Sequence, residues 1–316
     1  MLTPLVRLLA LKAGFVDVPR ADRHHRTPTP YLGGVAVFLA MLLGLLAIGE
    51  LTSGAPGHHG RVILLLVGAA SLVLGLADDW RHLSPPLKFA GQVGIATLFL
   101  AVAGPGPTGS AACDGVIGLF WIVGFMNAFN FLDNMDGVLA GVSFVAVLGL
   151  VGMSLAHGVT GSAWLLVLAG ALFGFLLFNA PPARIFLGDA GSLVLGGIVS
   201  AAAWMFASEV STPGAWFALP LILAYPLFDI LFVTVTRLKR GQRPWIGGRD
   251  HTTHRLNTLL GGPRRALLVV YALAVVGSLG AFAAAFSPGL LPLLPWWLIA
   301  LLFVGLGLRL TQVTVR

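Results

Sequence analysis

The chain has little charge and almost no cysteine. Only 10% of its 316 residues are charged, and 12 of these residues are acidic. The single cysteine, Cys113, excludes an internal disulfide, and one thiol is too few for a thiolate metal site. The long uncharged stretches leave no room for a separate soluble domain of any size, so a basic domain that would hold nucleic acid is excluded as well.

Apolar residues dominate the chain instead. The sequence is 57% hydrophobic with a mean hydropathy of +0.93, against roughly 45–50% apolar residues in a soluble domain. Segments long enough to cross roughly 30 Å of hydrocarbon lie at 31–51, 61–77, 87–104, 115–132, 138–157, 162–180, 191–208, 215–236, 265–286 and 290–309. We therefore expect an all-α polytopic integral membrane protein: a single transmembrane domain over residues 1–316, with about ten full spans and a short N-terminal helical segment.

Basic residues identify one side of these spans. Nearly all of the arginines and lysines fall in or beside one set of loops, whereas the opposite loops are almost free of them. By the positive-inside rule the basic side is cytoplasmic, and the cytoplasmic loops are 17–30, 78–86, 133–137, 181–190 and 237–264. The net charge of +7 is then a surface charge that can attract anionic lipid headgroups or an anionic substrate. The expected location is the plasma or inner membrane, with the active site on the cytoplasmic face.

Five aspartates interrupt the apolar sequence on this same side. They are Asp78 and Asp79 in LGLADDW, Asp133 and Asp136 in NFLDNMDG, and Asp189 in FLGDAGS. Acidic side chains are costly beside hydrocarbon, so they mark sites of function or ion binding. Magnesium takes one or two carboxylates together with substrate phosphates. The aspartates therefore suggest a divalent metal and a phosphate substrate.

The spacing around these aspartates suggests how they are presented. Asn127, Asn130, Asp133 and Asp136 recur every three residues, which places them on one face if the segment is helical. The Ala-Gly-Ser that follows Asp189 opens the next span, so free amides at a helix N-terminus could face a phosphate. The adjacent Asp78 and Asp79 repel each other, so a close cation is expected there: Arg81, Lys88 or Mg2+.

Each pattern has a structural alternative. The Asp-Asp pair could be a solvated helix end, and the asparagines could join helices. The GDAGS segment could be a turn with an N-cap, and the basic loop could be a topology signal alone. Function is favoured because the acidic breaks are separate along the chain and yet meet at one membrane face.

Five motifs occur in an order that resembles one family of enzymes. They are VDVP…HRTPTPYLGG, GLADDW, NAFNFLDNMDGVLAG, RIFLGDAGSLVLGG and GRDHTTHRL. From Phe15 to about Leu260 the chain resembles the polyprenyl-phosphate N-acetylhexosamine-1-phosphate transferases, the MraY/WecA-type membrane enzymes of glycosyltransferase family 4. The resemblance implies transfer of a sugar-1-phosphate, foremost N-acetylglucosamine-1-phosphate, from a UDP-sugar to undecaprenyl phosphate with release of UMP. It also implies Mg2+, with Mn2+ as an alternative, and a homodimer; it implies no nucleic acid partner.

The resemblance assigns a role to each matching residue. The metal ligands it implies are Asp189 and Asp136. The catalytic positions are Asp78, Asp79, Lys88 and Asp136, with the Asp-Asp pair beside the lipid phosphate. Substrate binding falls to Asn127, Asn130, Asp133, His25, Arg249, His251, His254 and Arg255. Asp229 also matches a family position, without a defined role.

Two departures from the family pattern bear on the substrate. Asp22 and Arg23 stand where the family usually has an Arg-Lys pair, and Thr252 and Thr253 precede His254 where adjacent histidines are common. The HTTH pattern favours the branch that uses UDP-N-acetylglucosamine. A phospho-N-acetylmuramoyl-pentapeptide transferase is the alternative enzyme. A secondary transporter, which also uses broken helices and acids within the membrane, is the alternative from another class.

Overall fold

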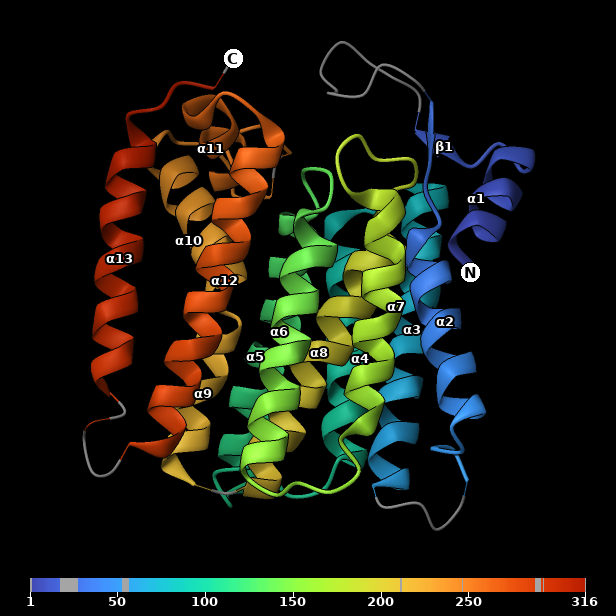
Figure 1. The fold of residues 1–316 in the computed structure, drawn as a ribbon, viewed down its shortest axis with the longest axis vertical. Coiled ribbons are helices and arrows are strands. Elements are labelled where there is room, and N and C mark those ends of the chain that lie inside the picture. The colour runs from blue at the N-terminus through green and yellow to red at the C-terminus, as the bar shows by residue number, and fades with distance from the viewer. Residues whose placement is uncertain are drawn as a thin grey trace.

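The computed structural model describes residues 2–17, 28–52, 57–210, 212–245, 247–287, 291 and 293–315. This part of the chain is almost entirely helical (Figure 1). The helices are α1 (Leu2–Lys12), α2 (Gly33–Ala47), α3 (His58–Arg81), α4 (Pro85–Val102), α5 (Ala111–Leu132), α6 (Val138–Ala156), α7 (Ala163–Asn179), α8 (Gly188–Val210), α9 (Pro213–Ile222), α10 (Ala224–Lys239), α11 (Thr252–Leu260), α12 (Pro263–Phe286) and α13 (Leu293–Thr311). A hairpin pairs β1 (Val16–Asp17) with β2 (Thr29–Pro30).

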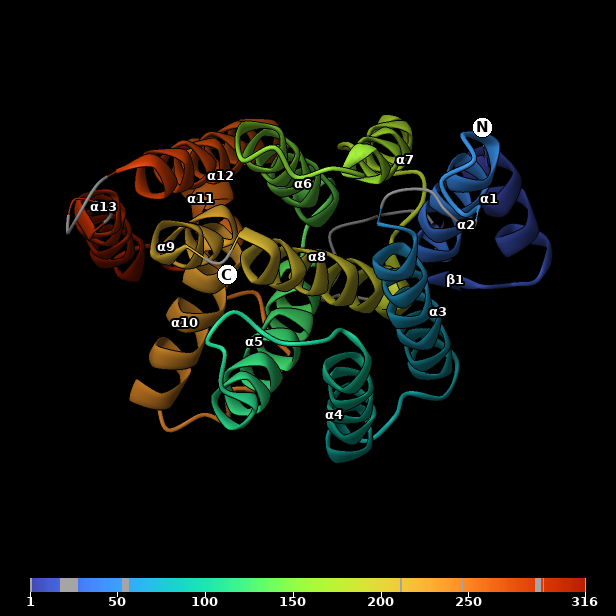
Figure 2. The same cartoon turned by 90° about the horizontal axis from the view of Figure 1, so that it is seen from below.

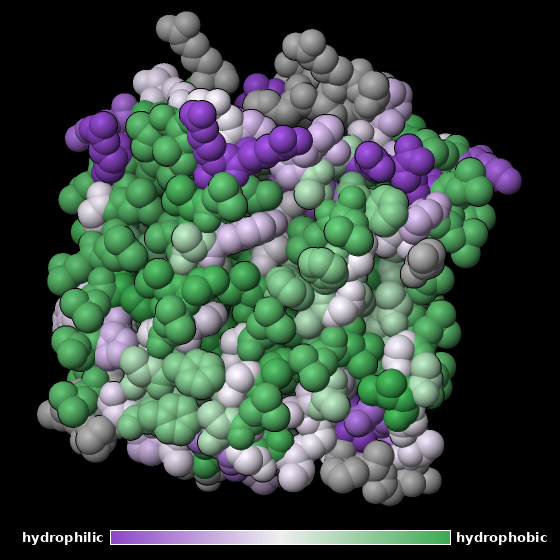
Figure 3. Space-filling model, viewed as in Figure 1, coloured by the Kyte–Doolittle hydropathy of each residue, from purple (hydrophilic) through white to green (hydrophobic). Residues whose placement is uncertain are grey.

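The helical architecture follows from the apolar sequence. Hydrocarbon offers no partner to a backbone amide or carbonyl, so a spanning segment must form its hydrogen bonds internally, as a helix does. Apolar side chains cover the middle height of the molecule, and polar ones gather at its ends (Figure 3). The all-α, polytopic membrane class expected from the sequence is confirmed, and so is a short N-terminal helix, α1.

The expected number of full spans was too high. Within the described residues seven helices are long and apolar enough to cross a membrane, and α9 with α10 makes an eighth if the pair is one span. Two expected spans, α2 and α7, have only 15 and 17 residues. Gly49, at a φ of 73°, follows the end of α2, and two consecutive prolines follow α7 closely. Glycine in this conformation and proline both end helices.

The expected span 215–236 is broken in its middle. The axes of α9 and α10 differ by 61° across Leu223. The cause is Pro226, which has no amide hydrogen to donate to the carbonyl four residues earlier and whose ring collides with that carbonyl. The break turns α10 toward the end of the molecule that holds α11.

Helix α8 forms the centre of the bundle. Viewed along the bundle, it lies among α3, α5, α6 and α9 (Figure 2), and nearly all of its span is buried. Small residues permit this close packing: a side chain at Gly75 of α3 would overlap the backbone of Ala190, and one at Gly34 of α2 would overlap Gly191. The contact at Gly75 brings the Asp-Asp pair of α3 against the start of α8.

Candidate active site

A large cavity opens at the end of the bundle where α3, α5 and α10 end and α8 begins. Its volume is about 1760 Å³, whereas small-molecule pockets typically enclose about 300–1,000 Å³. The predicted site residues on its wall are Asp79, Asn130, Asp133, Asp136, Asp189, Arg249, His251 and His254. Residues that are far apart in the sequence thus share one cavity, as their common membrane face predicts.

Lys88 is the cation beside Asp78, and it pairs with Asp189 rather than with Asp79. Its ammonium nitrogen lies 2.7 Å from Asp78 Oδ2 and 3.2 Å from Asp189 Oδ1. It also donates to Asn130 Oδ1 at 3.2 Å, and the amide of Asn130 donates in turn to Asp189 and to the hydroxyl of Ser192. Asp78 and Lys88 are not among the residues that line the cavity. They lie behind its wall and fix the position of Asp189.

Asp79 caps the N-terminus of α8. Its carboxylate accepts hydrogen bonds from the backbone amides of Asp189 at 2.8 Å and Ala190 at 3.0 Å. The expectation that free amides at this helix start would face a phosphate was therefore wrong for these two groups. An acidic side chain from another helix already satisfies them, because unpaired amides and the helix dipole attract negative charge.

The acidic segment after α5 is a turn rather than a continued helix. The helix ends at Leu132, and Asp133 adopts a φ of −77° and a ψ of 53°. The expected helical face that would include Asp133 and Asp136 is therefore broken. The Asp136 carboxylate instead accepts from the backbone amide of Ala183 at 2.8 Å, which joins this turn to the loop before α8. Burial, followed by the negative charges of neighbouring aspartates, raises the pKa of the Asp133 carboxyl to about 8.

Asn127 takes part in packing between helices. Its amide nitrogen donates to Gln92 Oε1 of α4 at 2.7 Å and to the Val123 carbonyl at 2.8 Å, and the residue is not among those that line the cavity. These are the contacts of an asparagine that joins helices. One turn later, Asn130 faces the cavity and binds Asp189, so the two asparagines differ in their surroundings.

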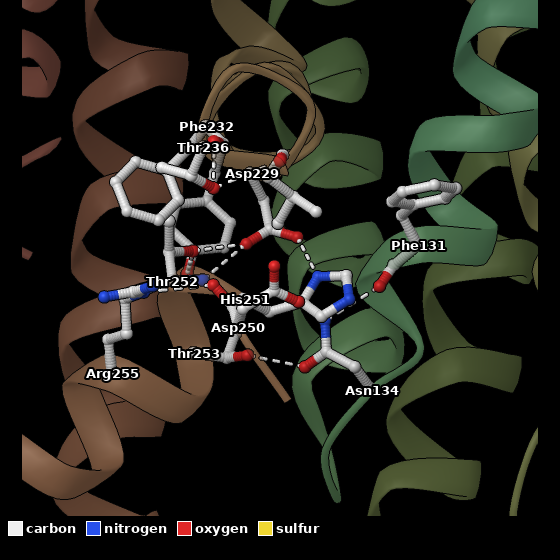
Figure 4. Close-up of polar contacts among 12 residues, drawn as sticks. Phe131, Asn134, Asp229, Phe232, Thr236, Asp250, His251, Thr252, Thr253 and Arg255 are labelled. Atoms are coloured by element: carbon white, nitrogen blue, oxygen red, sulfur yellow. Dashed lines mark hydrogen bonds and ion pairs between the residues drawn. The ribbon is translucent and has the colours of Figure 1, made fainter. Parts of the chain in front are cut away.

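Residues 249–256, which include the first turn of α11, are called the histidine loop. This loop is anchored to α10 and to the turn after α5 (Figure 4). His251 Nδ1 lies 2.8 Å from Asp229 Oδ2, and the Thr252 hydroxyl lies 2.5 Å from Asp229 Oδ1. The Thr253 hydroxyl donates to Asn134 Oδ1 at 2.5 Å. Both threonines are fully buried, at 0% exposure. They therefore support the loop and do not contact a ligand in the cavity directly.

Comparisons with known proteins agree with this arrangement. A model of the family described as "Glycosyl transferase family 4" matches residues 61–207. A Bacillus subtilis protein named "Probable undecaprenyl-phosphate N-acetylglucosaminyl 1-phosphate transferase" is 32% identical over 294 residues, which cover 89% of this chain and 80% of the relative. The chain belongs to glycosyl transferase family 4.

Other known proteins are similar to this chain at the same level. The decaprenyl-phosphate N-acetylglucosaminephosphotransferase of Mycobacterium tuberculosis is 32% identical, with 89% of this chain and 78% of the relative covered. A phospho-N-acetylmuramoyl-pentapeptide-transferase of Deinococcus radiodurans is 35% identical over 232 residues, which cover 66% of this chain and 69% of the relative. The segment matched by the family 4 model contains all five aspartates and Lys88, whereas the histidine loop lies beyond it.

Arg255, which was also expected to bind substrate, is not among the residues that line the cavity. Arg255 donates to the carbonyls of Leu310 at 2.9 Å and Val313 at 2.6 Å, so its guanidinium ties α11 to the end of α13. His25 lies outside the described residues. Arg249 lines the cavity as expected.

Arg237 is a cavity residue that the sequence did not single out. It ends α10 and is buried, and its guanidinium forms a two-point contact with the Asp250 carboxylate at 2.6 and 3.0 Å. Its guanidinium also lies 5.8 Å from the ring of Phe131. In the sequence Arg237 is one of several basic residues at a helix end, and only its burial distinguishes it from the others.

The acidic wall fits Mg2+ that binds together with a substrate. Among the described residues, no group of three or more histidine, cysteine or acidic side chains forms a complete metal cage. Magnesium does not need one, because it typically takes one or two carboxylates and completes its shell with phosphates and water. Asp189 and Asp136 offer such oxygens on the wall. Burial and, after it, the negative charges of neighbouring aspartates raise the pKa of Asp133, and a cation would neutralise those charges.

Proposed function

We propose that this protein transfers N-acetylglucosamine-1-phosphate from UDP-N-acetylglucosamine to a polyprenyl phosphate, undecaprenyl phosphate foremost, and releases UMP. The observation that carries the proposal is one large cavity at one end of an apolar bundle, which has four of the five predicted aspartates and the histidine loop on its wall. Its volume of about 1760 Å³ gives room for a nucleotide sugar beside a lipid phosphate. The similarity to transferases named for this reaction supports it.

In the proposed reaction an oxygen of the lipid phosphate attacks the sugar-linked phosphorus. The bond between that phosphorus and the UMP oxygen breaks, and UMP leaves with the electron pair. Such a transfer depends mainly on positioning and on neutralising charge at the transferred group. When bound, Mg2+ would supply part of that neutralisation at the diphosphate.

The protein's own contribution is to hold the acidic groups in place. Lys88 fixes Asp78 and Asp189, and Asn130 links Lys88 to Asp189. Asp78 also accepts the Leu83 amide at 2.7 Å, so its carboxylate is committed to the protein. An ionised lipid phosphate needs no general base, and we propose that Asp78 positions Lys88 and does not accept a proton.

We propose that the cavity faces the cytoplasm of a cell with the protein in its plasma membrane. The end of the molecule that holds the cavity also holds the arginine-rich segment between α10 and α12, and such segments stay inside. UDP-sugars are cytoplasmic metabolites, which agrees with this orientation. We propose that the protein forms a homodimer, as the family resemblance implies.

The test is UMP release by the purified protein in detergent with undecaprenyl phosphate and Mg2+. UDP-N-acetylglucosamine is expected to give UMP and a lipid diphospho-sugar, both of which require the lipid acceptor. UDP-N-acetylmuramoyl-pentapeptide is the second donor, because of the similarity to the Deinococcus enzyme; turnover with this donor alone would replace the proposed sugar. Uptake of a UDP-sugar into proteoliposomes without any UMP formation would support the transporter instead.

A further inference from the structure

Asp229 is a fully buried carboxylate within α10. It is 0% exposed, and such a charge is costly unless it is paired and hydrogen-bonded. Its Oδ1 accepts the Thr252 amide at 2.9 Å and the Thr252 hydroxyl at 2.5 Å, while its Oδ2 lies 2.8 Å from His251 Nδ1. Both carboxylate oxygens are therefore engaged by the histidine loop (Figure 4).

The contact with Asp229 fixes which nitrogen of His251 holds a proton. A carboxylate can only accept, so His251 Nδ1 must carry the hydrogen of this bond. The imidazole also lines the cavity. With Nδ1 directed to a carboxylate that is sealed inside the protein, the edge of the ring that contains Nε2 is left for the cavity.

Neighbouring side chains hold the ring in this orientation. Tyr225 of α10 contacts the Thr252 hydroxyl at 3.0 Å, which secures the residue next to His251. The ring centroid of Phe131 lies 5.9 Å from that of His251, and the centroid of His254 lies 6.1 Å away. The neighbouring carboxylate on the loop, Asp250, pairs with Arg237 and Arg240. Asp229 is the carboxylate that contacts the ring.

We propose that Asp229 is a positioning residue that keeps His251 Nδ1 protonated, so that Nε2 faces a substrate phosphate. In the imidazolium form both ring nitrogens are donors, so Nε2 donates to a phosphate oxygen while Nδ1 stays bonded to Asp229. The imidazolium lies between two anions, one from the protein and one from the substrate. The identity of that substrate rests on the proposed function; the protonated Nδ1 does not.

The Asp229→Asn variant removes the negative charge of the carboxylate and leaves the size and shape of the side chain nearly unchanged. The asparagine oxygen can still accept from Thr252, and this leaves its NH2 group against His251 Nδ1. Two donors cannot share that contact, so Nδ1 must give up its hydrogen and the neutral ring carries it on Nε2. The variant keeps the volume of the side chain but removes the imidazolium. We expect kcat/KM for the UDP-sugar to fall about 10–100-fold, the loss that is typical when the hydrogen-bonding partner of a metal-bound histidine is removed.

The first measurement is of proton position and does not depend on activity. In protein labelled with nitrogen-15 histidine, the His251 signals are assigned by their loss in His251→Gln. A protonated Nδ1 is expected in the wild type and an unprotonated Nδ1 in Asp229→Asn. An unprotonated Nδ1 in the wild type overturns the proposal, even if the variant fails to fold.

The second measurement divides the kinetic effect between the substrates. In Asp229→Asn we expect KM for the UDP-sugar to rise while KM for the polyprenyl phosphate stays within a factor of about two, a split that a general loss of structure would not produce. The matched control is Asp114→Asn, which makes the same change at another buried carboxylate, bound to Thr108 at the opposite end of the molecule. Wild-type constants in Asp229→Asn would refute the positioning role, whereas no UMP from the wild type would refute only the proposed function.

Discussion

At the scale of single residues, the aspartates of the site differ in the groups that they contact. Lys88 pairs with both Asp78 and Asp189. Both oxygens of Asp79 accept hydrogen bonds from the first amides of α8. Asp133 keeps its proton to an unusually high pH because it is buried beside other aspartates. The site is poised to take up positive charge, and two predictions follow from that property.

The first concerns Asp189. Replacing it with asparagine removes the charge that Lys88 and the proposed metal share, but the side chain still offers an oxygen and a nitrogen to Asn130 and Lys88. We expect turnover, measured as UMP release at saturating Mg2+, to fall by on the order of 100-fold or more. The melting temperature should change little.

Glu209→Gln is the control for that variant. It removes a carboxylate from an exposed position at the other end of the same helix, α8. The control should keep wild-type turnover. If Asp189→Asn also turned over normally at ordinary Mg2+ concentrations, Asp189 would have no place in the metal site.

The second prediction concerns pH. The pKa of Asp133 is about 8 in the folded protein against 3.8 for an ordinary aspartate, so between these values the folded state holds a proton that the unfolded state has lost. The melting temperature of metal-free protein should therefore fall as pH rises from about 5 to 8. Added Mg2+ should raise the melting temperature more at pH 8 than at pH 6, because fewer of the Asp133 carboxyls still hold a proton that the metal must displace.

The decisive comparison for pH is Asp133→Asn, which cannot titrate. Its melting temperature should depend less on pH over this window, and Mg2+ should act on it more evenly. An unchanged pH slope in the variant would mean that another group causes the effect.

At the scale of elements, the start of α8 depends on a residue of α3. Asp79 supplies the cap that would ordinarily come from a side chain next to the helix start, and the close approach at Gly75 makes this possible. We expect Asp79→Ala to destabilise the protein by about 0.5–2 kcal/mol, the usual cost of a lost cap. Thermal unfolding in detergent measures this cost. Asp79→Asn keeps one acceptor oxygen and should lose less; equal losses in the two variants would argue against capping.

The elements show where sequence patterns succeed and where they fail. Apolar length predicted most helices because hydrocarbon imposes internal hydrogen bonding. It did not predict the break at Leu223, since a proline can stand in the first turn of a helix as well as bend a span. The Asn-Asp ladder failed at Leu132 because spacing alone cannot show where a helix ends. The sequence could not predict the cap on α8, since Asp79 and Ala190 are 111 positions apart.

At the scale of the whole molecule, the orientation in the membrane has a natural reporter. Cys113 is exposed and lies near the start of α5, at the opposite end of that helix from Asp133. A membrane-impermeant maleimide should label it in intact cells. Arg243→Cys in a Cys113→Ser background places a thiol on the basic loop and should react only after lysis. Labelling of position 243 from outside would invert the proposed topology.

The site as a whole was more predictable than its individual contacts. Charge bias and alternating spans place the aspartates and histidines on one side, and the structure brings eight of the predicted residues to one cavity. The sequence could not separate Asn130, which faces that cavity, from Asn127, which binds Gln92. Nor could it show that Arg255 turns toward the C-terminal carbonyls. These distinctions depend on which way a side chain points, and that is decided by distant neighbours.

The two buried threonines of the histidine loop have a consequence for evolution and for engineering. Thr252 is tied to Asp229, 23 positions away, and Thr253 to Asn134, 119 positions away. A larger residue at either place has no room unless its partner changes too. If residues 251–254 are replaced by the matching segment of a relative, the relative's preference for a UDP-sugar donor should therefore not be transferred. The unit that can be exchanged is the loop together with Asp229 and Asn134. Thr252 should therefore vary together with Asp229, and Thr253 together with Asn134, among descendants of this sequence.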